Sequence, residues 1–105
     1  MIPRTVPSTS SLLASKIKVP QHVVYRSFPS ETVVLNLNTG KYHGLNATAG
    51  RMLEELERAD CVRDAASVLA ESYDKAQSVI EQDLCVLCSA LLERGLIEAD
   101  GSPSP

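Results

Sequence analysis

Aromatic side chains are scarce in this chain of 105 residues, which contains one Phe, three Tyr and no Trp. A hydrophobic core must therefore be built almost entirely from aliphatic side chains. The length indicates a single domain. A chain of this size can bury enough apolar surface to fold without disulfides or a structural metal.

Clustered positive charge is also missing. The chain has 10 Lys and Arg against 13 Asp and Glu, a net charge of −3, and it contains no basic block. Because contacts to phosphates require clustered Lys and Arg, this composition argues against a nucleic-acid partner. No apolar run is long enough to span a bilayer, and residues 1–20 lack the continuous apolar segment of a signal peptide. We therefore expect a cytoplasmic protein that binds neither nucleic acid nor membrane.

Cysteine occurs three times, an odd number, which indicates free thiols in a reducing compartment. Cys85 and Cys88 have the C-x-x-C spacing of redox and zinc motifs. Those motifs lie at the start of a helix or on a loop. This pair lies in the middle of a predicted helix, with no second cysteine pair and no nearby His. We interpret both as small packing residues, and we predict no metal site and no cofactor.

Patterns typical of catalysis are lacking too. His22 and His43 are far apart in the sequence, and we interpret both as surface residues of strands. The chain has no nucleophile elbow and no glycine-rich phosphate loop. We therefore predict that this protein is not an enzyme.

The chain does contain a β-hairpin that runs directly into a helix. Residues 32–37 are rich in β-branched side chains and predict a strand, and residues 38–40, Asn-Thr-Gly, predict a turn. The returning strand, residues 41–45, is short and polar, as expected for a sheet edge. Such an edge has unpaired N–H and C=O groups that can accept another chain. Asn46 is the expected N-cap of the following helix.

Other elements are predicted on both sides of this hairpin. Residues 1–19 are expected to be a flexible N-terminal arm, although Leu12-Leu13 and Ile17 could dock locally. Residues 100–105 are expected to be a disordered tail, which leaves 20–99 as the domain. Within it we expect a first strand at 22–26 and helices at 47–58, 61–73 and 75–94, with Asp60 and Asp74 as N-caps and Gly95 ending the last helix.

The third of these helices is apolar over most of its circumference. Its periodicity predicts a core face formed by Ala76, Ile80, Leu84, Leu87 and Leu91. Two further apolar strips flank that face: Val79, Val86 and Ala90 with Asp83 at the border, and Cys85, Cys88 and Leu92 on the other side. A small domain with three helices can hardly bury all of this surface. We therefore expect part of the helix to line a groove that a partner fills.

Several short pieces, in this order and spacing, resemble the PqqD-like family. The pieces are Val34-Leu35-Asn36-Leu37, Thr39-Gly40-Lys41-Tyr42, Leu45-Asn46-Ala47-Thr48-Ala49-Gly50, Ile80-x-x-Asp83-Leu84-x-x-Leu87, Leu91 and Gly95-Leu96-Ile97. The resemblance covers roughly residues 20–98. It implies an α+β fold of the winged helix-turn-helix type, with a three-stranded antiparallel sheet followed by three helices.

The resemblance also implies a function. The family includes recognition elements for ribosomally made, post-translationally modified peptides (RiPPs). This chain is most similar to the stand-alone versions of lasso-peptide pathways, which bind the leader of a precursor peptide and present it to a separate leader peptidase. The leader is expected to add a strand beside residues 41–45 and to rest on the third helix. The implied peptide-binding residues are Lys41, Tyr42, His43, Gly44, Val79, Ile80, Asp83, Val86 and Leu87.

Two alternatives stay open. One is a PqqD-like chaperone for another modified peptide, such as a quinone cofactor precursor. The other, which we rank lower, is a DNA-binding winged helix. That function needs a basic recognition helix, whereas Ile80-Glu81-Gln82-Asp83 is acidic.

Overall fold

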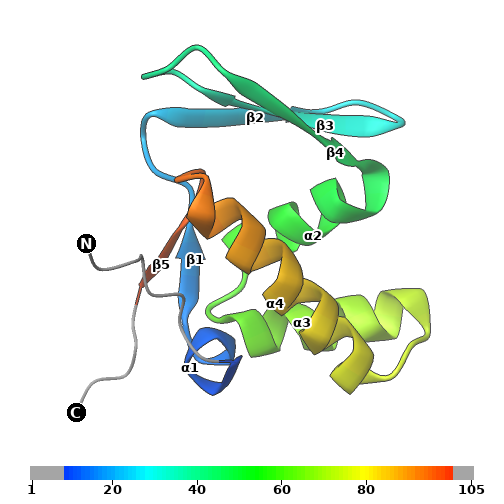
Figure 1. The fold of residues 1–105 in the computed structure, drawn as a ribbon. Coiled ribbons are helices and arrows are strands. Elements are labelled where there is room, and N and C mark those ends of the chain that lie inside the picture. Colours follow the sequence, from blue (N-terminus) through cyan, green and yellow to red (C-terminus); the bar gives the residue numbers. More distant parts are fainter. Residues whose placement is uncertain (1–8, 101–105) are drawn as a thin grey trace.

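The computed structural model describes residues 9–100, and the sheet forms a layer on top of a group of helices (Figure 1). In chain order the elements are α1 (Thr9–Leu13), β1 (Lys16–Lys18), β2 (Val23–Ser27), β3 (Glu31–Asn36), β4 (Tyr42–Asn46), α2 (Ala47–Arg58), α3 (Val62–Tyr73), α4 (Gln77–Glu93) and β5 (Glu98–Asp100). Strands β2, β3 and β4 form a three-stranded antiparallel sheet in that order. The predicted α+β winged fold is confirmed.

The hairpin and the helix after it form where the local signals place them. Gly40 adopts a positive φ of 75° in the turn between β3 and β4. The Asn46 side chain accepts a hydrogen bond from the Ala49 N–H at 2.8 Å, so it caps α2 as predicted. Helix α2 packs under the sheet, and a Cβ at Gly50 would overlap the buried Thr32 side chain of β3. Glycine at this position therefore allows the helix to approach the sheet closely.

The core between these layers is aliphatic, as the composition requires. Its largest fully buried side chains are Leu12, Ile17, Val34, Leu53, Leu56, Val62, Leu69, Ile80, Leu84, Leu96 and, as the one thiol, Cys88. These side chains come from segments before, within and after the hairpin. The whole described chain therefore contributes to one core.

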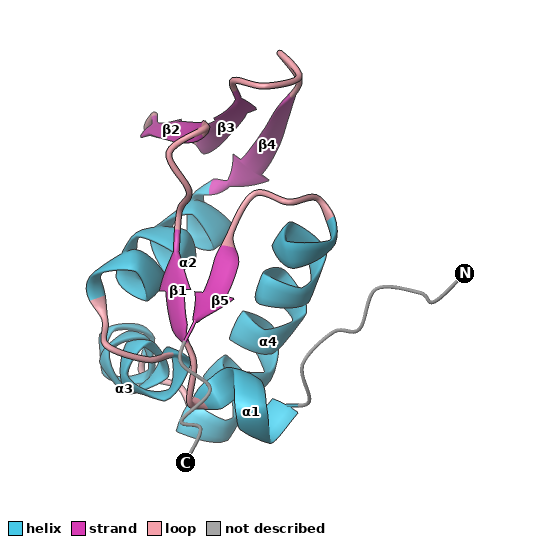
Figure 2. Cartoon of the chain, turned by 90° about the vertical axis from the view of Figure 1, so that its left-hand side faces the viewer, coloured by secondary structure: helices cyan, strands magenta, loops and turns pink. Residues whose placement is uncertain are grey.

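The N-terminal segment differs from the flexible arm expected for residues 1–19. Leu12 and Ile17 are buried, and β1 pairs antiparallel with β5 (Figure 2). The Lys16 Nζ donates to the carbonyls of Glu57 and Ala59, each at 2.6 Å, which satisfies the end of α2. Residues 9–18 thus belong to the folded domain, and residues 1–8 lie outside the described part. At the other end, β5 includes Asp100, whereas 101–105 are not described.

Two of the predicted helix caps are also wrong. Cys61, not Asp60, stands at the N-cap of α3, without a side-chain hydrogen bond. Asp74 ends α3 in a left-handed conformation with φ 54°, and α4 begins only at Gln77. Asp adopts this conformation more readily than most residues, which explains why it serves as a C-cap here. Gly95, with φ 70°, follows the C-cap of α4 as predicted.

Candidate functional site

The free edge of the sheet is strand β4. Among residues 9–100, β4 pairs only with β3, and Val34 lies opposite His43 in their register. The Asn36 N–H donates to the Lys41 carbonyl at 2.9 Å, which shows that these two opposite residues form a hydrogen-bonded pair. Hydrogen bonding alternates along an antiparallel pair. His43 therefore points its backbone groups at β3, whereas Tyr42 and Gly44 point theirs outward, where a further strand can pair.

The other edge strand, β2, is a poorer acceptor. The same alternation directs the backbone of its residues 23, 25 and 27 outward. The Val23 N–H already donates to the Pro20 carbonyl at 3.0 Å, so the start of this edge is occupied.

The side chains of β4 alternate between the two faces of the sheet. His43 is half-buried on the face toward the helices, and its Nδ1 lies 2.7 Å from Nη1 of Arg94, just after α4. Because a guanidinium can only donate, Nδ1 must act as the acceptor. This hydrogen bond ties the open edge strand to the C-terminal end of α4. Lys41 precedes β4 and is exposed.

The core face of α4 differs from the predicted one. Cys88 is fully buried, whereas Leu87 is half-buried and Ala76 is exposed at the helix start. The core face is thus formed by Ile80, Leu84, Cys88 and Leu91. Its shift toward Cys88 has a physical cause: α1, which the periodicity did not predict, contacts this side of α4.

One of the two apolar strips that flank the core face of α4 is left uncovered. Val79 and Val86 are 46% and 66% exposed, and Asp83 and Ala90 are also exposed. The spacing i, i+4, i+7 and i+11 puts these four residues in one stripe, which we call the α4 stripe. Arg94, which reaches β4, follows Ala90 by one helical turn. The stripe therefore leads toward the open edge strand.

The nine predicted peptide-binding residues are not equivalent in the structure. Tyr42 and Gly44 offer backbone groups at the edge, and Val79, Asp83 and Val86 offer exposed side chains on the stripe. Ile80 is buried in the core, so its side chain is not accessible to a peptide. Arg94 did not emerge from the sequence, because no local pattern signals a contact with a residue 51 positions away.

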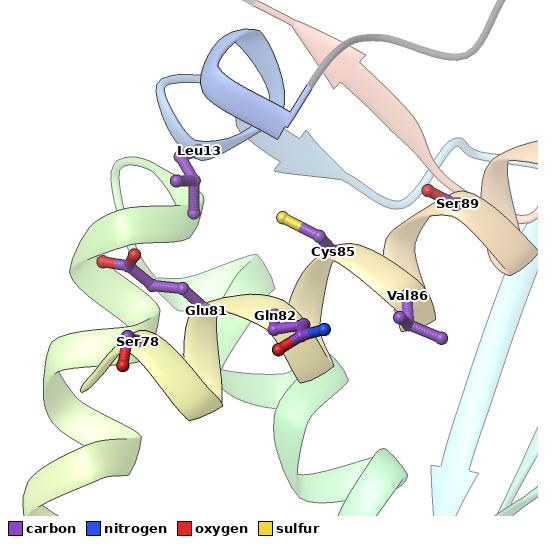
Figure 3. A pocket seen from close by; sticks show the side chains of 7 residues that line it. All are labelled: Leu13, Ser78, Glu81, Gln82, Cys85, Val86 and Ser89. Atoms are coloured by element: carbon purple, nitrogen blue, oxygen red, sulfur yellow. The ribbon is translucent and has the colours of Figure 1, made fainter. Parts of the chain in front are cut away.

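Beside the α4 stripe, and sharing Val86 with it, lies an open depression of about 630 Å³. Figure 3 shows Leu13 of α1 and Cys85 of α4 on its wall, with the polar Ser78, Gln82 and Ser89 around it. It exists because α1 stands beside α4. Sequence periodicity could not reveal it, since α1 itself was not predicted.

The two cysteines of α4, Cys85 and Cys88, are thiols of low reactivity. Burial raises the pKa of Cys88 to about 12, and burial, followed by the nearby charge of Glu81, also raises the pKa of Cys85. Both are therefore protonated thiols at neutral pH, poor as nucleophiles and as metal ligands. Within residues 9–100, no group of three or more His, Cys, Asp or Glu side chains could hold a metal ion. No helix in the same part of the chain is long and apolar enough to cross a membrane.

The structure defines a winged helix-turn-helix domain with an open sheet edge beside an exposed helix stripe. Residues 31–97 match the family described as Coenzyme PQQ synthesis protein D (PqqD). This match covers more than half of the sequence, and the chain belongs to the PqqD family. Comparison with curated proteins gives no match.

Three solved structures are similar to this fold. One, described as TbiB1 in complex with the TbiA(beta) leader peptide, is 30% identical, with a TM-score of 0.70 over 77% of this chain and 94% of that chain. A lasso peptide synthetase B1 complexed with a leader peptide is 23% identical, with a TM-score of 0.70 over 79% and 98%. The PqqD part of PqqCD from Methylobacterium extorquens, described as a RiPP recognition element, is 20% identical, with a TM-score of 0.65 over 85% and 98%.

Proposed function

We propose that this protein binds the leader segment of a ribosomally made precursor peptide and presents it to a separate leader peptidase or modifying enzyme, in biosynthesis of the lasso-peptide type. The observation that carries this proposal is the free edge of β4, where Tyr42 and Gly44 direct their backbone groups outward. The similarity to a 30% identical chain solved with its leader peptide supports it.

The two parts of the site contribute differently to recognition. A leader strand beside β4 forms main-chain hydrogen bonds, which provide affinity with little dependence on sequence. Leader side chains that project toward α4 meet Val79 and Val86, with the Asp83 carboxylate between them, and these contacts provide selectivity. The hydrogen bond between His43 and Arg94 connects the β4 edge to the end of α4 that carries the stripe.

We further propose that the protein acts as an adaptor in the cytoplasm and has no catalytic activity of its own. The raised pKa values of Cys85 and Cys88 argue against either thiol as a nucleophile. The family description favours a second candidate, a precursor of the quinone cofactor PQQ, which the same strand edge would bind.

Titration of fluorescently labelled leader peptides against the purified protein tests the proposal. We expect a Kd of about 1 μM or tighter, which corresponds to roughly −8 kcal/mol or a more negative free energy. A labelled DNA duplex serves as the control for the winged-helix alternative and should not bind. Binding of the duplex, with no binding of the leader from the neighbouring precursor gene, would overturn the proposal. Tight binding of a quinone-type precursor alone would favour the second candidate.

A further inference from the structure

The charges of helix α4 are all negative. Between Gln77 and Glu93 the helix contains Glu81, Asp83 and Glu93, and it contains no Lys or Arg. Asp83 belongs to the α4 stripe, whereas Glu81 lines the depression that shares Val86 with the stripe. A peptide that crosses α4 from the stripe into the depression therefore meets a carboxylate in each place.

The Glu81 carboxylate is held in position but is not neutralised. Its Oε2 accepts a hydrogen bond from Nε2 of Gln77 at 3.0 Å, one helical turn earlier. Within residues 9–100, no Lys, Arg or His forms an ion pair with it. Because Glu81 is half-buried, solvent screens a cation beside it less than a cation beside a fully exposed carboxylate.

The depression has the shape and lining of a site for an extended peptide. It runs along α4 from Ser78 to Ser89, and Figure 3 shows Leu13 of α1 above Glu81 and Cys85. These two ends lie about 16 Å apart along the helix, a distance that about five extended residues span. Leu13 and Cys85 provide apolar contacts, and the two Ser hydroxyls can form hydrogen bonds.

The depression is continuous with the proposed leader site. Val86 belongs both to the depression and to the α4 stripe. Arg94, which contacts His43 of β4, comes eight positions after Val86. This separation is about 12 Å along the helix, which about four extended residues cover. A leader that leaves the edge of β4 near Arg94 therefore reaches the depression within a few residues.

The need for cleavage determines which end of the leader lies there. The cleavage site and the core peptide follow the leader at its C-terminal end, and both must stay accessible to the processing enzyme. The segment that crosses α4 must therefore lie N-terminal to the strand that pairs with β4.

We propose that the depression between α1 and α4 binds the N-terminal segment of the leader, and that Glu81 selects a Lys or Arg in that segment. This inference rests on the proposed function and narrows it to precursors with a basic residue upstream of the leader strand. The edge of β4 provides affinity with little dependence on sequence. The depression distinguishes one precursor from another, because Glu81 and Asp83 attract basic segments and repel acidic ones.

Cysteine modification locates the bound leader without any substitution. Cys85 lines the depression, whereas Cys61, also half-buried, lies outside it at the N-cap of α3 and serves as the internal control. The full-length protein is treated with N-ethylmaleimide, with and without saturating leader from the neighbouring precursor gene. We expect the leader to slow modification of Cys85 by about fivefold or more, because it blocks access. The rate at Cys61 should stay the same, as mass spectrometry of the peptides can show.

Charge exchange tests the role of Glu81. We expect Glu81→Gln to weaken leader binding about threefold and Glu81→Lys about tenfold or more, because the second change replaces attraction by repulsion. Glu71→Gln, at an exposed carboxylate of α3, is the matched control and should stay within about twofold. A leader whose upstream Lys and Arg are replaced by Gln should bind wild type and Glu81→Lys equally.

The outcomes separate this inference from the proposed function. If the wild type binds no leader, the proposed function fails. If the leader binds but Cys85 keeps its rate, or if folded Glu81→Lys binds as tightly as the wild type, only the inference is wrong. Faster modification of Cys85 in leader-free Arg4→Glu protein would assign the depression to residues 1–8 and overturn the inference. Circular dichroism verifies each variant, and Glu81→Gln with the modification rates keeps the test decisive if Glu81→Lys fails to fold.

Discussion

Replacing Gly44 by Pro removes a single outward N–H from the strand edge while the rest of the site stays in place. Gly44 lies opposite Val33 in a pair whose ladder hydrogen bonds are absent, so the lost donor serves no bond within the sheet. Its φ is not positive, and edge strands tolerate proline where the N–H faces solvent. The domain should therefore fold with nearly the stability of the wild type.

The loss of leader affinity can be estimated from the missing bond. A typical hydrogen bond contributes about 1 kcal/mol net, and an acceptor left unsatisfied costs about 1–3 kcal/mol. We expect Gly44→Pro to weaken leader binding by about 2 kcal/mol, which is roughly 30-fold in Kd. The matched control is Gly44→Ala, because its added Cβ would lie 3.6 Å from Oε1 of Glu31, an ordinary contact, and the N–H is kept.

Fluorescence anisotropy gives the two affinities, and thermal melting followed by circular dichroism verifies the fold. His43→Pro provides an internal contrast, because its N–H points at β3 and its loss should destabilise the sheet itself. Equal leader affinity for Gly44→Pro and Gly44→Ala, in two folded proteins, would refute strand addition at β4.

The remaining predictions concern α4, its thiol and the contact of α2 with the sheet. Val86→Asp should weaken leader binding by about 2 kcal/mol in a folded protein, because it places a charge on the apolar α4 stripe that the leader covers. Leu84→Asp should instead unfold the domain, because Leu84 is buried in the core; circular dichroism with leader titration distinguishes the two outcomes. Cys88 should resist iodoacetamide at pH 8 until denaturant is added, as mass spectrometry can show. Because its pKa is raised from 9.0 to about 12, the stability it contributes should be complete below pH 9 and decline as the pH rises toward 12. Gly50→Ala should lower the free energy of unfolding by about 1–3 kcal/mol, since the new Cβ overlaps Thr32; an unchanged urea midpoint would contradict this.

Local signals were reliable where a residue acts on its neighbours in the sequence. The helix at residues 47–58 was predicted with its observed bounds, and its Asn46 cap follows from a side chain that reaches three residues ahead. Helical periodicity also indicated that the last helix carries more apolar surface than a small domain can cover, and Val79 and Val86 are indeed exposed.

Local signals failed where distant segments meet. Helix α1 has five residues and β1 has three, too few for a periodic pattern; α1 is held by contacts to α3 and α4, and β1 by contacts to β5 and α2. Their presence moves Cys88 from a predicted flank into the core. Asp74 was predicted to begin a helix but ends one, because the same residue type can cap either end.

The sequence by itself determined the class of the protein: an aliphatic, acidic chain with a hairpin followed by helices, and with the pieces that resemble the PqqD-like family. Only the tertiary structure decided which backbone groups of β4 are free. Its register with β3 determines which residues of β4 hydrogen-bond to β3 and which point outward. The tertiary structure also decided which flank of α4 stays open and that Arg94 meets His43. Periodicity reports a residue's position on its own element, whereas accessibility depends on what the rest of the chain packs against that element.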